Sequence, residues 1–243
     1  MTPVLSPPDA PPLDAWKEFR QRLGEFARSR SDGVRVAVPK HGHVYNPGRD
    51  PHGYFIVEGQ VKLVVNAPNG KRCLLAVCTN GDVVGEFGPG GAERAETAVA
   101  LRRTVIWRFA PARFLDALAA NDMIEEYLAY KAAQVLHQQT VIVDMVTMES
   151  ERRLAACLLG LCRRMGVRVG PLVHIDTRLT QEELAEMVGT TRSRVGHFLK
   201  GFRTAGMVRL TRRSTLLVDE QGLAEYLQGY GRTRPARGMG EAA

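Results

Sequence analysis

The chain contains 243 residues, 44% of them hydrophobic and 24% charged, and its formal net charge is +7. This length and apolar content suit two modest domains better than one large domain. No run of residues is apolar enough to span a bilayer, and the proline-rich start MTPVLSPPDAPP has no apolar signal core, so the composition argues against a membrane protein and predicts a cytoplasmic one.

The excess of basic residues lies in the C-terminal part of the chain. Residues 1–150 contain 17 basic and 17 acidic side chains, whereas residues 151–243 contain 16 basic and 9 acidic ones. Such an asymmetry is typical of a nucleic-acid-binding part joined to a neutral part. Basic surfaces also bind membranes and acidic partners, so charge alone leaves those alternatives open.

The N-terminal region is predicted to contain a tail and one helix. The first dozen residues cannot bury enough apolar surface to offset their chain entropy, and we expect them to be disordered. Residues 14–30 place Trp16, Phe19, Leu23 and Phe26 on one face at helical spacing.

Short strand-like segments punctuated by glycine follow from about residue 34 to residue 109. They are VRVAV, GYFIVEG, QVKLVVN, RCLLAVC, GDVVGEF, TAVALRR and TVIWRF. Their spacing predicts an antiparallel barrel or sandwich, with the sequence PNG, Pro68–Gly70, as a hairpin turn.

A long helix is predicted over residues 121–149. Positions along it repeat in alternating steps of four and three, which is the pattern of a coiled-coil seam. The seam consists of Ile124, Leu128, Lys131, Val135, Gln138, Ile142 and Met145. The helix could pack on its own β-domain, but we favour pairing with a second copy in a parallel homodimer, in which the polar positions set the register.

The remaining chain reads as helices followed by a wing. ERRLAACLLGLCRRMG predicts a helix that ends at Gly166. Thr180 and Glu183 form a capping box that starts the next helix, and Gly189 separates this helix from a third one. VRLTRRSTLLVDEQGLAEYL predicts a two-stranded wing and a short helix, and the tail from about Gly231 is expected to be disordered.

The third of these helices presents a basic face opposite its apolar residues Val195, Phe198, Leu199 and Phe202. Free helix-terminal amides, hydroxyl groups and guanidinium groups suit phosphates and base edges. We therefore predict a DNA-binding surface that contains Thr180, Gln181, Thr190, Thr191, Arg192, Ser193, Arg194, His197 and Lys200.

In this order, the β-domain, the long helix and the basic helix-turn-helix with a wing resemble the Crp/Fnr family of bacterial transcription regulators. The segments VYNPGRDPHGYFIVEGQVKL (44–63), GDVVGEF (81–87) and GTTRSRVGHFLKGFRTAGMV (189–208) carry the resemblance. It implies a non-enzymatic, homodimeric regulator that binds double-stranded DNA and acts with RNA polymerase.

The resemblance also implies an α+β fold with the following organisation. Residues 1–30 form the tail and first helix, and residues 31–118 form a cyclic-nucleotide-binding-like sensory barrel, a double-stranded β-helix or jelly roll. Residues 119–150 form the dimerisation helix, residues 151–230 the winged helix-turn-helix domain and residues 231–243 a basic tail.

A nucleotide site is a further implication of the resemblance. In nucleotide-binding members a glycine and a glutamate hold the ribose, and an Arg-Ser or Arg-Thr pair holds the cyclic phosphate. These positions match Gly85, Glu86, Arg94 and Ala95 here. Because Ala95 has no hydroxyl and the intervening FGPGGAE loop is short, we expect weak or absent binding of cyclic AMP and cyclic GMP.

Other interpretations of this region stay open. A cyclic dinucleotide, another metabolite or no effector could replace the cyclic mononucleotide, and an ion pair between Glu86 and Arg94 could simply brace the loop. Family members contact adenine from the middle of the long helix. The matching residues Gln138, Gln139 and Thr140 either face a ligand, or are solvated, or set the register of the dimer.

In the recognition helix, Arg192 matches the arginine that reads guanine in family members. Ser193 stands where many members have a glutamate, and His197 replaces a further arginine, so the half-site should differ from the best-known one. Arg194 is expected to contact phosphate.

Metal and redox sites are not predicted. The pairs Cys73/Cys78 and Cys157/Cys162 have spacings unsuited to chelation, so we expect four reduced thiols. Residues 1–72 contain no cysteine, which excludes the iron–sulfur branch of the family. His41, His43 and His52 are expected in a solvent-exposed turn, and the alternative of a cupin-like metal-dependent barrel lacks the required histidine and glutamate spacing.

Overall fold

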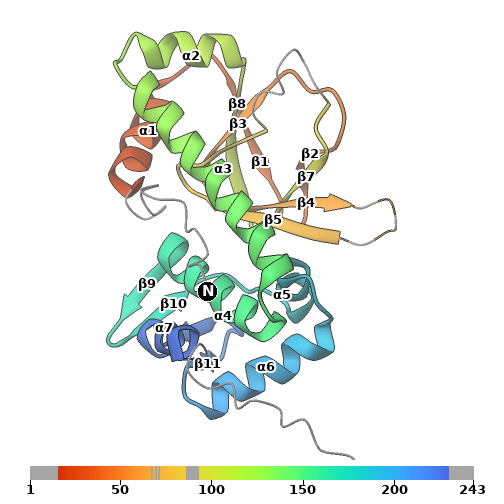
Figure 1. Cartoon of the computed structure of the whole chain (residues 1–243). Helices are drawn as coiled ribbons and strands as arrows, with labels where there is room; N and C mark the ends of the chain where they lie inside the picture. The colour runs from red at the N-terminus through yellow and green to blue at the C-terminus, as the bar shows by residue number, and fades with distance from the viewer. Residues whose placement is uncertain (1–15, 67, 69, 71, 86–92, 230–243) are drawn as a thin grey trace, which may run out of the picture. The chain divides into compact units, whose positions relative to one another are not determined.

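The computed structural model describes residues 16–66, 68, 70, 72–85 and 93–229 (Figure 1). The chain divides into two compact units, Met1–Thr147 and Met148–Ala243. The two segments that we predict to be disordered, the first dozen residues and the tail from about Gly231, lie outside the described residues.

Two four-stranded antiparallel sheets form the body of the N-terminal unit. One has the order β1-β8-β3-β6 and consists of β1 (Val34–Val38), β8 (Thr104–Phe109), β3 (Gly53–Glu58) and β6 (Val83–Val84). The other has the order β2-β7-β4-β5 and consists of β2 (His43–Tyr45), β7 (Glu96–Ala100), β4 (Gln60–Asn66) and β5 (Arg72–Thr79). The described residues form no strand pairing that closes these two sheets into the predicted barrel.

Most predicted strands are confirmed, with two differences. Within GDVVGEF, the described residues 81–85 contain the two-residue strand β6. The chain turns on either side of this strand at Gly81 (φ 87°) and Gly85 (φ 68°), where glycine adopts left-handed backbone angles at no steric cost. The strand β2 was not predicted as an element of its own. The expected turn at Pro68–Gly70 includes Asn69, which is outside the described residues, although β4 and β5 pair antiparallel around it.

Alternation along the strands produces two apolar cores. In β8, Ile106 points between the two sheets, where Ile56, Val61 and Ala98 are also buried. The neighbouring Trp107 belongs to the second core, which lies between the first sheet and the helices.

Three helices cover this second core. They are α1 (Lys17–Ser29), α2 (Pro111–Ala119) and α3 (Ile124–Thr147), and Figure 1 shows α1 beside α3. The predicted helices over residues 14–30 and 121–149 are confirmed within a few residues at their ends. The helix α2 was not predicted; it starts with Pro111 in its first turn and buries Phe114 and Leu118, one turn apart.

The helix α3 carries two apolar stripes. Tyr127 and Tyr130 are buried against the rest of the unit. The predicted seam residues Leu128, Val135 and Ile142, seven residues apart, are instead 56%, 51% and 54% exposed. This second stripe therefore has no cover within the described part of its own unit.

One seam residue deviates from the prediction. Lys131 Nζ donates to the carbonyl of Val83 (3.5 Å) and to Gln134 Oε1, so its side chain turns towards the sheets rather than continuing the exposed stripe. Lys131 therefore makes polar contacts within its own unit. The side chain of Met145 is outside the described residues.

The C-terminal unit combines helices with a small sheet. Its helices are α4 (Ser150–Met165), α5 (Gln181–Val188), α6 (Arg192–Thr204) and α7 (Glu220–Gly229). The sheet has the order β11-β12-β10-β9, from β9 (Gly166–Val169), β10 (Leu172–Ile175), β11 (Val208–Leu210) and β12 (Leu216–Val218). The predicted two-stranded wing is thus half of a four-stranded sheet, because β10 pairs with β12.

None of the helices in the described residues is long and apolar enough to cross a membrane.

Candidate nucleic-acid interface and effector site

Caps define the start of α5 and both ends of the turn between α5 and α6. Thr180 Oγ1 accepts from the amide of Glu183 (3.1 Å) and the Glu183 carboxylate accepts from the amide of Thr180 (2.9 Å), which confirms the predicted capping box. Gly189 ends α5 with left-handed angles (φ 66°), and Thr191 caps α6 by accepting from the amide of Arg194 (3.4 Å).

Arg153 in α4 is a positioning residue that the sequence analysis missed. Its guanidinium donates to the carbonyls of Val188 (2.7 Å) and Gly189 (3.5 Å) at the end of α5, and also to that of Met148 (2.5 Å). Free carbonyls at a helix end attract cations. Arg153 therefore ties the turn before the recognition helix to α4, and only the tertiary contact reveals this role.

The two faces of α6 are confirmed. Val195, Phe198, Leu199 and Phe202 are buried. The described surface of this helix contains no acidic residue, and its predicted DNA-binding side chains Arg192, Ser193, Arg194, His197 and Lys200 are all exposed. Together with Arg203, which is also exposed, they make one basic face, defined here as the α6 basic face.

The other predicted DNA-binding residues surround the start of this face. Thr180, Gln181 and Thr191 are exposed, and Thr190 is half-buried. Gln181 lies at the contact between the two helices, since a Cβ added at Gly196 would be 3.1 Å from its Oε1. A larger residue than glycine at position 196 would therefore push against Gln181.

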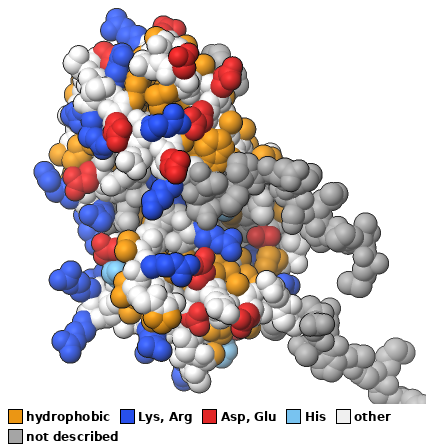
Figure 2. Space-filling model, turned by 90° about the vertical axis from the view of Figure 1, so that its left-hand side faces the viewer, with side chains coloured by type: hydrophobic (Ala, Val, Ile, Leu, Met, Phe, Trp, Pro, Cys, Tyr) orange, Lys and Arg blue, Asp and Glu red, His pale blue; other side chains and the backbone are white. Residues whose placement is uncertain are grey.

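The wing carries two further exposed cations. Arg212 and Arg213 lie in the turn between β11 and β12, where the Thr211 and Thr215 hydroxyls are 2.7 Å apart. His174 Nε2 is 2.8 Å from Thr215 Oγ1, so β10 braces the turn. The wing was predicted from the sequence, but these two arginines were not assigned to DNA binding, although two adjacent arginines in a predicted turn are a recognisable signal. In space-filling view, Lys and Arg side chains project from the surface with Asp and Glu side chains between them (Figure 2).

In the N-terminal unit, Arg94 is the candidate phosphate ligand, and its side chain is only 7% exposed. Its Nη1 lies 2.9 Å from Asp50 Oδ2, and its Nη2 donates to the carbonyls of His52 and Gly85. The guanidinium carbon lies 4.7 Å from the ring centroid of Tyr45 and 5.6 Å from that of Tyr54.

Asp50 is held by several donors. Tyr54 Oη donates to Oδ2, the amide of His52 donates to Oδ1 (3.0 Å), and His52 Nδ1 is 2.9 Å from the same oxygen. Burial raises the pKa of Asp50, but the hydrogen bonds from Tyr54 and His52 and the charge of Arg94 outweigh it and lower the pKa from 3.8 to about 2. Burial and the adjacent carboxylate raise the pKa of Tyr54 to about 12.

The structure brings together only some of the predicted effector residues. Gly85 lies against Arg94, since a Cβ at Gly85 would be 3.2 Å from the guanidinium carbon and 2.8 Å from the Tyr45 ring. Glu86 is outside the described residues. Ala95 is exposed. Arg94 forms an ion pair with Asp50, and this pairing was not predicted from the sequence.

In the described part of the chain, no polar contact joins the predicted residues on α3 to this cluster. Among the described residues, the Thr140 hydroxyl donates to the carbonyl of Leu136 (3.0 Å) in its own helix, Gln139 is exposed and Gln138 is half-buried. These contacts do not distinguish between residues that face a ligand, residues that are solvated and residues that set the register of a dimer.

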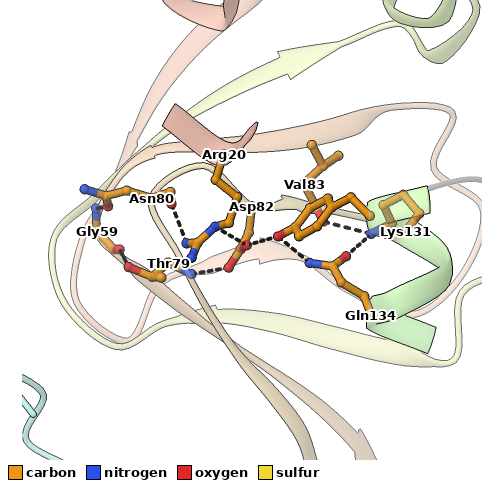
Figure 3. Close-up of polar contacts among 9 residues, drawn as sticks. Arg20, Gly59, Thr79, Asn80, Asp82, Val83, Lys131 and Gln134 are labelled. Carbon is orange, nitrogen blue, oxygen red and sulfur yellow. Dashed lines mark hydrogen bonds and ion pairs between the residues drawn. The ribbon is translucent and has the colours of Figure 1, made fainter. Parts of the chain in front are cut away.

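A buried polar network ties α3 and α1 to the sheets (Figure 3). Asp82 is fully buried and its Oδ1 accepts from Tyr130 Oη and lies 3.2 Å from Arg20 Nε. Its Oδ2 accepts from the amide of Thr79 (2.7 Å). Gln134 Nε2 donates to Tyr130 Oη (2.7 Å), so one carboxylate connects three parts of the chain.

The thiols and histidines have local structural contacts. All four cysteines are free, and burial raises the pKa of Cys157 and of Cys162 to about 12. Such thiols are protonated and unreactive at neutral pH. His52 belongs to the Asp50 cluster, and His43 bonds Asn46. No group of three or more His, Cys, Asp or Glu side chains suited to a metal occurs among the described residues.

Two family models match the chain. A cyclic nucleotide-binding domain matches residues 35–121, and a Crp-like helix-turn-helix domain matches residues 152–226. Among curated proteins, the CRP-like cAMP-activated global transcriptional regulator of Mycobacterium tuberculosis is 30% identical over 179 residues, which cover 70% of this chain and 77% of that protein. The cAMP-activated global transcriptional regulator CRP of Escherichia coli O157:H7 is 25% identical over 150 residues, or 60% of this chain and 71% of that protein.

Solved structures share the fold at lower identity. A CooA variant from Carboxydothermus hydrogenoformans has a TM-score of 0.68 and 21% identity, covering 84% of this chain and 94% of that one. The c-di-GMP-responsive global regulator CLP from Xanthomonas campestris has a TM-score of 0.64 and 17% identity, covering 83% of this chain and 99% of that one.

Proposed function

The chain belongs to the Crp/Fnr family of transcription regulators, and from this premise we propose a homodimer that binds a two-fold symmetric DNA site and responds to a phosphate-bearing nucleotide at Arg94. It is a DNA-binding transcription regulator with an N-terminal sensing domain. The further parts of the proposal are its dimeric state, its contact residues and its effector.

The α6 basic face carries the proposal for DNA recognition. Its exposed cations lie beside the capped start of the helix, where free amides also favour phosphate. Arg192 at this start is suited to bidentate contacts with guanine O6 and N7. We assign Lys200 and the wing residues Arg212 and Arg213 to phosphate contacts, because all three are exposed cations outside the first turn of α6.

The exposed stripe of α3 supports a dimer. Leu128, Val135 and Ile142 repeat every seven residues and are more than half exposed. Such a stripe is stable in water when a second helix covers it, and an identical helix does so with matching spacing. A dimer also places two recognition helices for two half-sites. The proposal includes a cytoplasmic location and contact with RNA polymerase, since a bacterial regulator acts on transcription there.

Two observations support a nucleotide effector. The M. tuberculosis relative is activated by cAMP according to its name, and Gly85 and Arg94 supply a close backbone approach and a phosphate ligand. Ala95 lacks the hydroxyl that would complete the phosphate site, and one hydrogen bond to a charged group contributes about 1.5–3 kcal/mol. Cyclic AMP and cyclic GMP should therefore bind the native protein weakly.

Selection of binding sequences from randomised duplex DNA tests the proposed function. The full-length protein should enrich a two-fold symmetric sequence with half-site centres about 10 base pairs apart. Enrichment of a sequence without symmetry would contradict the dimer, and absence of any enriched sequence would contradict sequence-specific recognition. The selection is run with and without cyclic AMP.

A further inference from the structure

Arg94 already has an anionic partner inside the protein. Its Nη1 contacts Asp50 Oδ2 at 2.9 Å, while its Nη2 is engaged by two backbone carbonyls. The carbonyls belong to His52 and Gly85 and are neutral, so the only charge that balances Arg94 among its described partners is the Asp50 carboxylate. A ligand phosphate that used this guanidinium would meet the carboxylate at the same edge.

The backbone keeps Asp50 in this place. Gly48 and Arg94 form a two-way bridge in which each amide donates to the other residue's carbonyl, both at 3.0 Å. Gly48 has φ 120°, which a side chain would strain, so the chain turns there and presents Asp50 to the guanidinium. Asp50 is itself 21% exposed, and its neighbours Arg49 and Pro51 are exposed, so the carboxylate lies at the surface end of the cluster.

The groups around the Arg94 guanidinium suit other anions as well as the Asp50 carboxylate. The rings of Tyr45 and Tyr54 stack with centroids 5.3 Å apart and line the guanidinium, and Tyr54 Oη and the His52 amide point their protons at the anionic group. A phosphodiester oxygen accepts from the same kinds of donor as a carboxylate oxygen.

We propose that Asp50 is an internal anion which occupies the phosphate position of the effector site, so that a cyclic nucleotide binds only by displacing the Asp50 carboxylate from Arg94. This inference rests on the proposed effector site at Arg94 and goes beyond it, because it assigns a selectivity and regulatory role to a residue outside the phosphate-binding segment. Asp50 then sets the nucleotide concentration at which the sensing domain responds.

Removing the charge of Asp50 should strengthen nucleotide binding. Breaking the part-buried ion pair between Asp50 and Arg94 costs free energy that a binding phosphate must offset. Asp50→Asn should therefore bind cyclic AMP roughly 10- to 100-fold more tightly than the native protein. Asparagine has a similar shape, and its one carbonyl oxygen can still accept from either Tyr54 or the His52 amide, which donate to different oxygens of Asp50. Titration calorimetry of the full-length protein with cyclic AMP, cyclic GMP and cyclic di-GMP separates mononucleotide from dinucleotide binding.

A matched control and a second variant make the result specific. Arg30 and Asp32 form another part-buried ion pair in the same unit, with Arg30 Nε 2.8 Å from Asp32 Oδ1, and Asp32→Asn should leave nucleotide affinity unchanged. If Asp50→Asn fails to fold by circular dichroism, Asp50→Ser provides a second neutral side chain. The gain in nucleotide affinity should disappear in the double variant Asp50→Asn, Arg94→Ala, because the phosphate then lacks the Arg94 guanidinium as a partner.

The outcomes distinguish this inference from the proposed effector site. Equal or weaker binding by Asp50→Asn, including no binding by either protein, overturns the role of Asp50. If Arg94→Ala weakens binding while Asp50→Asn does not strengthen it, the site at Arg94 stands and only the inference fails. A gain that persists in the double variant shows that the nucleotide binds elsewhere, and both then fail.

Discussion

At the scale of single residues, the α6 basic face allows base reading to be separated from phosphate contact. Arg192→Ala should cost roughly 1–3 kcal/mol at the selected site and relax the preference at one base position. Lys200→Ala should weaken binding to selected and unrelated duplexes by a similar factor, because a phosphate contact carries no base information. Fluorescence anisotropy with a set of single-base variants measures both effects. Retention of the full base preference in Arg192→Ala would contradict the assignment of that residue.

Asp50 should also make the N-terminal unit sensitive to acid. Its pKa is lowered from 3.8 to about 2, so it stabilises the fold at pH values above its unfolded-state pKa, and this contribution is lost as pH falls through the folded-state value. Between pH of about 5 and 2, the native protein should lose on the order of 2 kcal/mol more than Asp50→Asn. Urea unfolding followed by tryptophan fluorescence reports this unit alone, because both tryptophans, Trp16 and Trp107, belong to it. Parallel pH profiles for the two proteins would rule the prediction out.

At the scale of elements, the buried network around Asp82 holds α1 and α3 on the first sheet. Asp82→Asn should destabilise the N-terminal unit by roughly 3 kcal/mol, because it leaves the buried end of Arg20 without its counter-charge. Asp116→Asn is a suitable control: Asp116 is an exposed carboxylate in α2, and its replacement should change stability by less than about 0.5 kcal/mol. Urea unfolding monitored by tryptophan fluorescence compares the two variants, and equal effects would mean that the network adds no stability.

The exposed stripe of α3 should control the oligomeric state. Val135→Glu combined with Ile142→Glu places two like charges where the second helix is expected, so the protein should become monomeric while its tryptophan fluorescence stays native. Val34, in an edge strand, is 51% exposed like Val135, and Val34→Glu should leave the dimer intact. Sedimentation velocity measures both variants. A stable dimer in the doubly substituted protein would show that another surface makes the interface.

At the scale of the whole molecule, the charge distribution predicts how DNA binding responds to salt. The excess of basic over acidic residues lies in the C-terminal part, and the described cations of α6 and the wing are exposed. Each phosphate neutralised should contribute about −0.9 to the slope of log affinity against log salt concentration. Titrations at several salt concentrations should therefore give a steep negative slope, which Lys200→Ala reduces by about one. A slope near zero would mean that binding does not use these cations.

The order of the elements and the faces of the helices could be predicted from the sequence. Hydrophobic periodicity, the Thr180–Glu183 capping box and Gly189 are local features, and local features are sufficient to predict α3, α5 and α6 and the basic face of α6. The contacts between residues that are distant in the chain could not be predicted and were seen only in the folded protein. Asp50 reaches Arg94, Arg153 reaches the end of α5, and β10 joins the wing because strand pairing and helix packing bring distant segments together, and no spacing within one segment encodes such contacts.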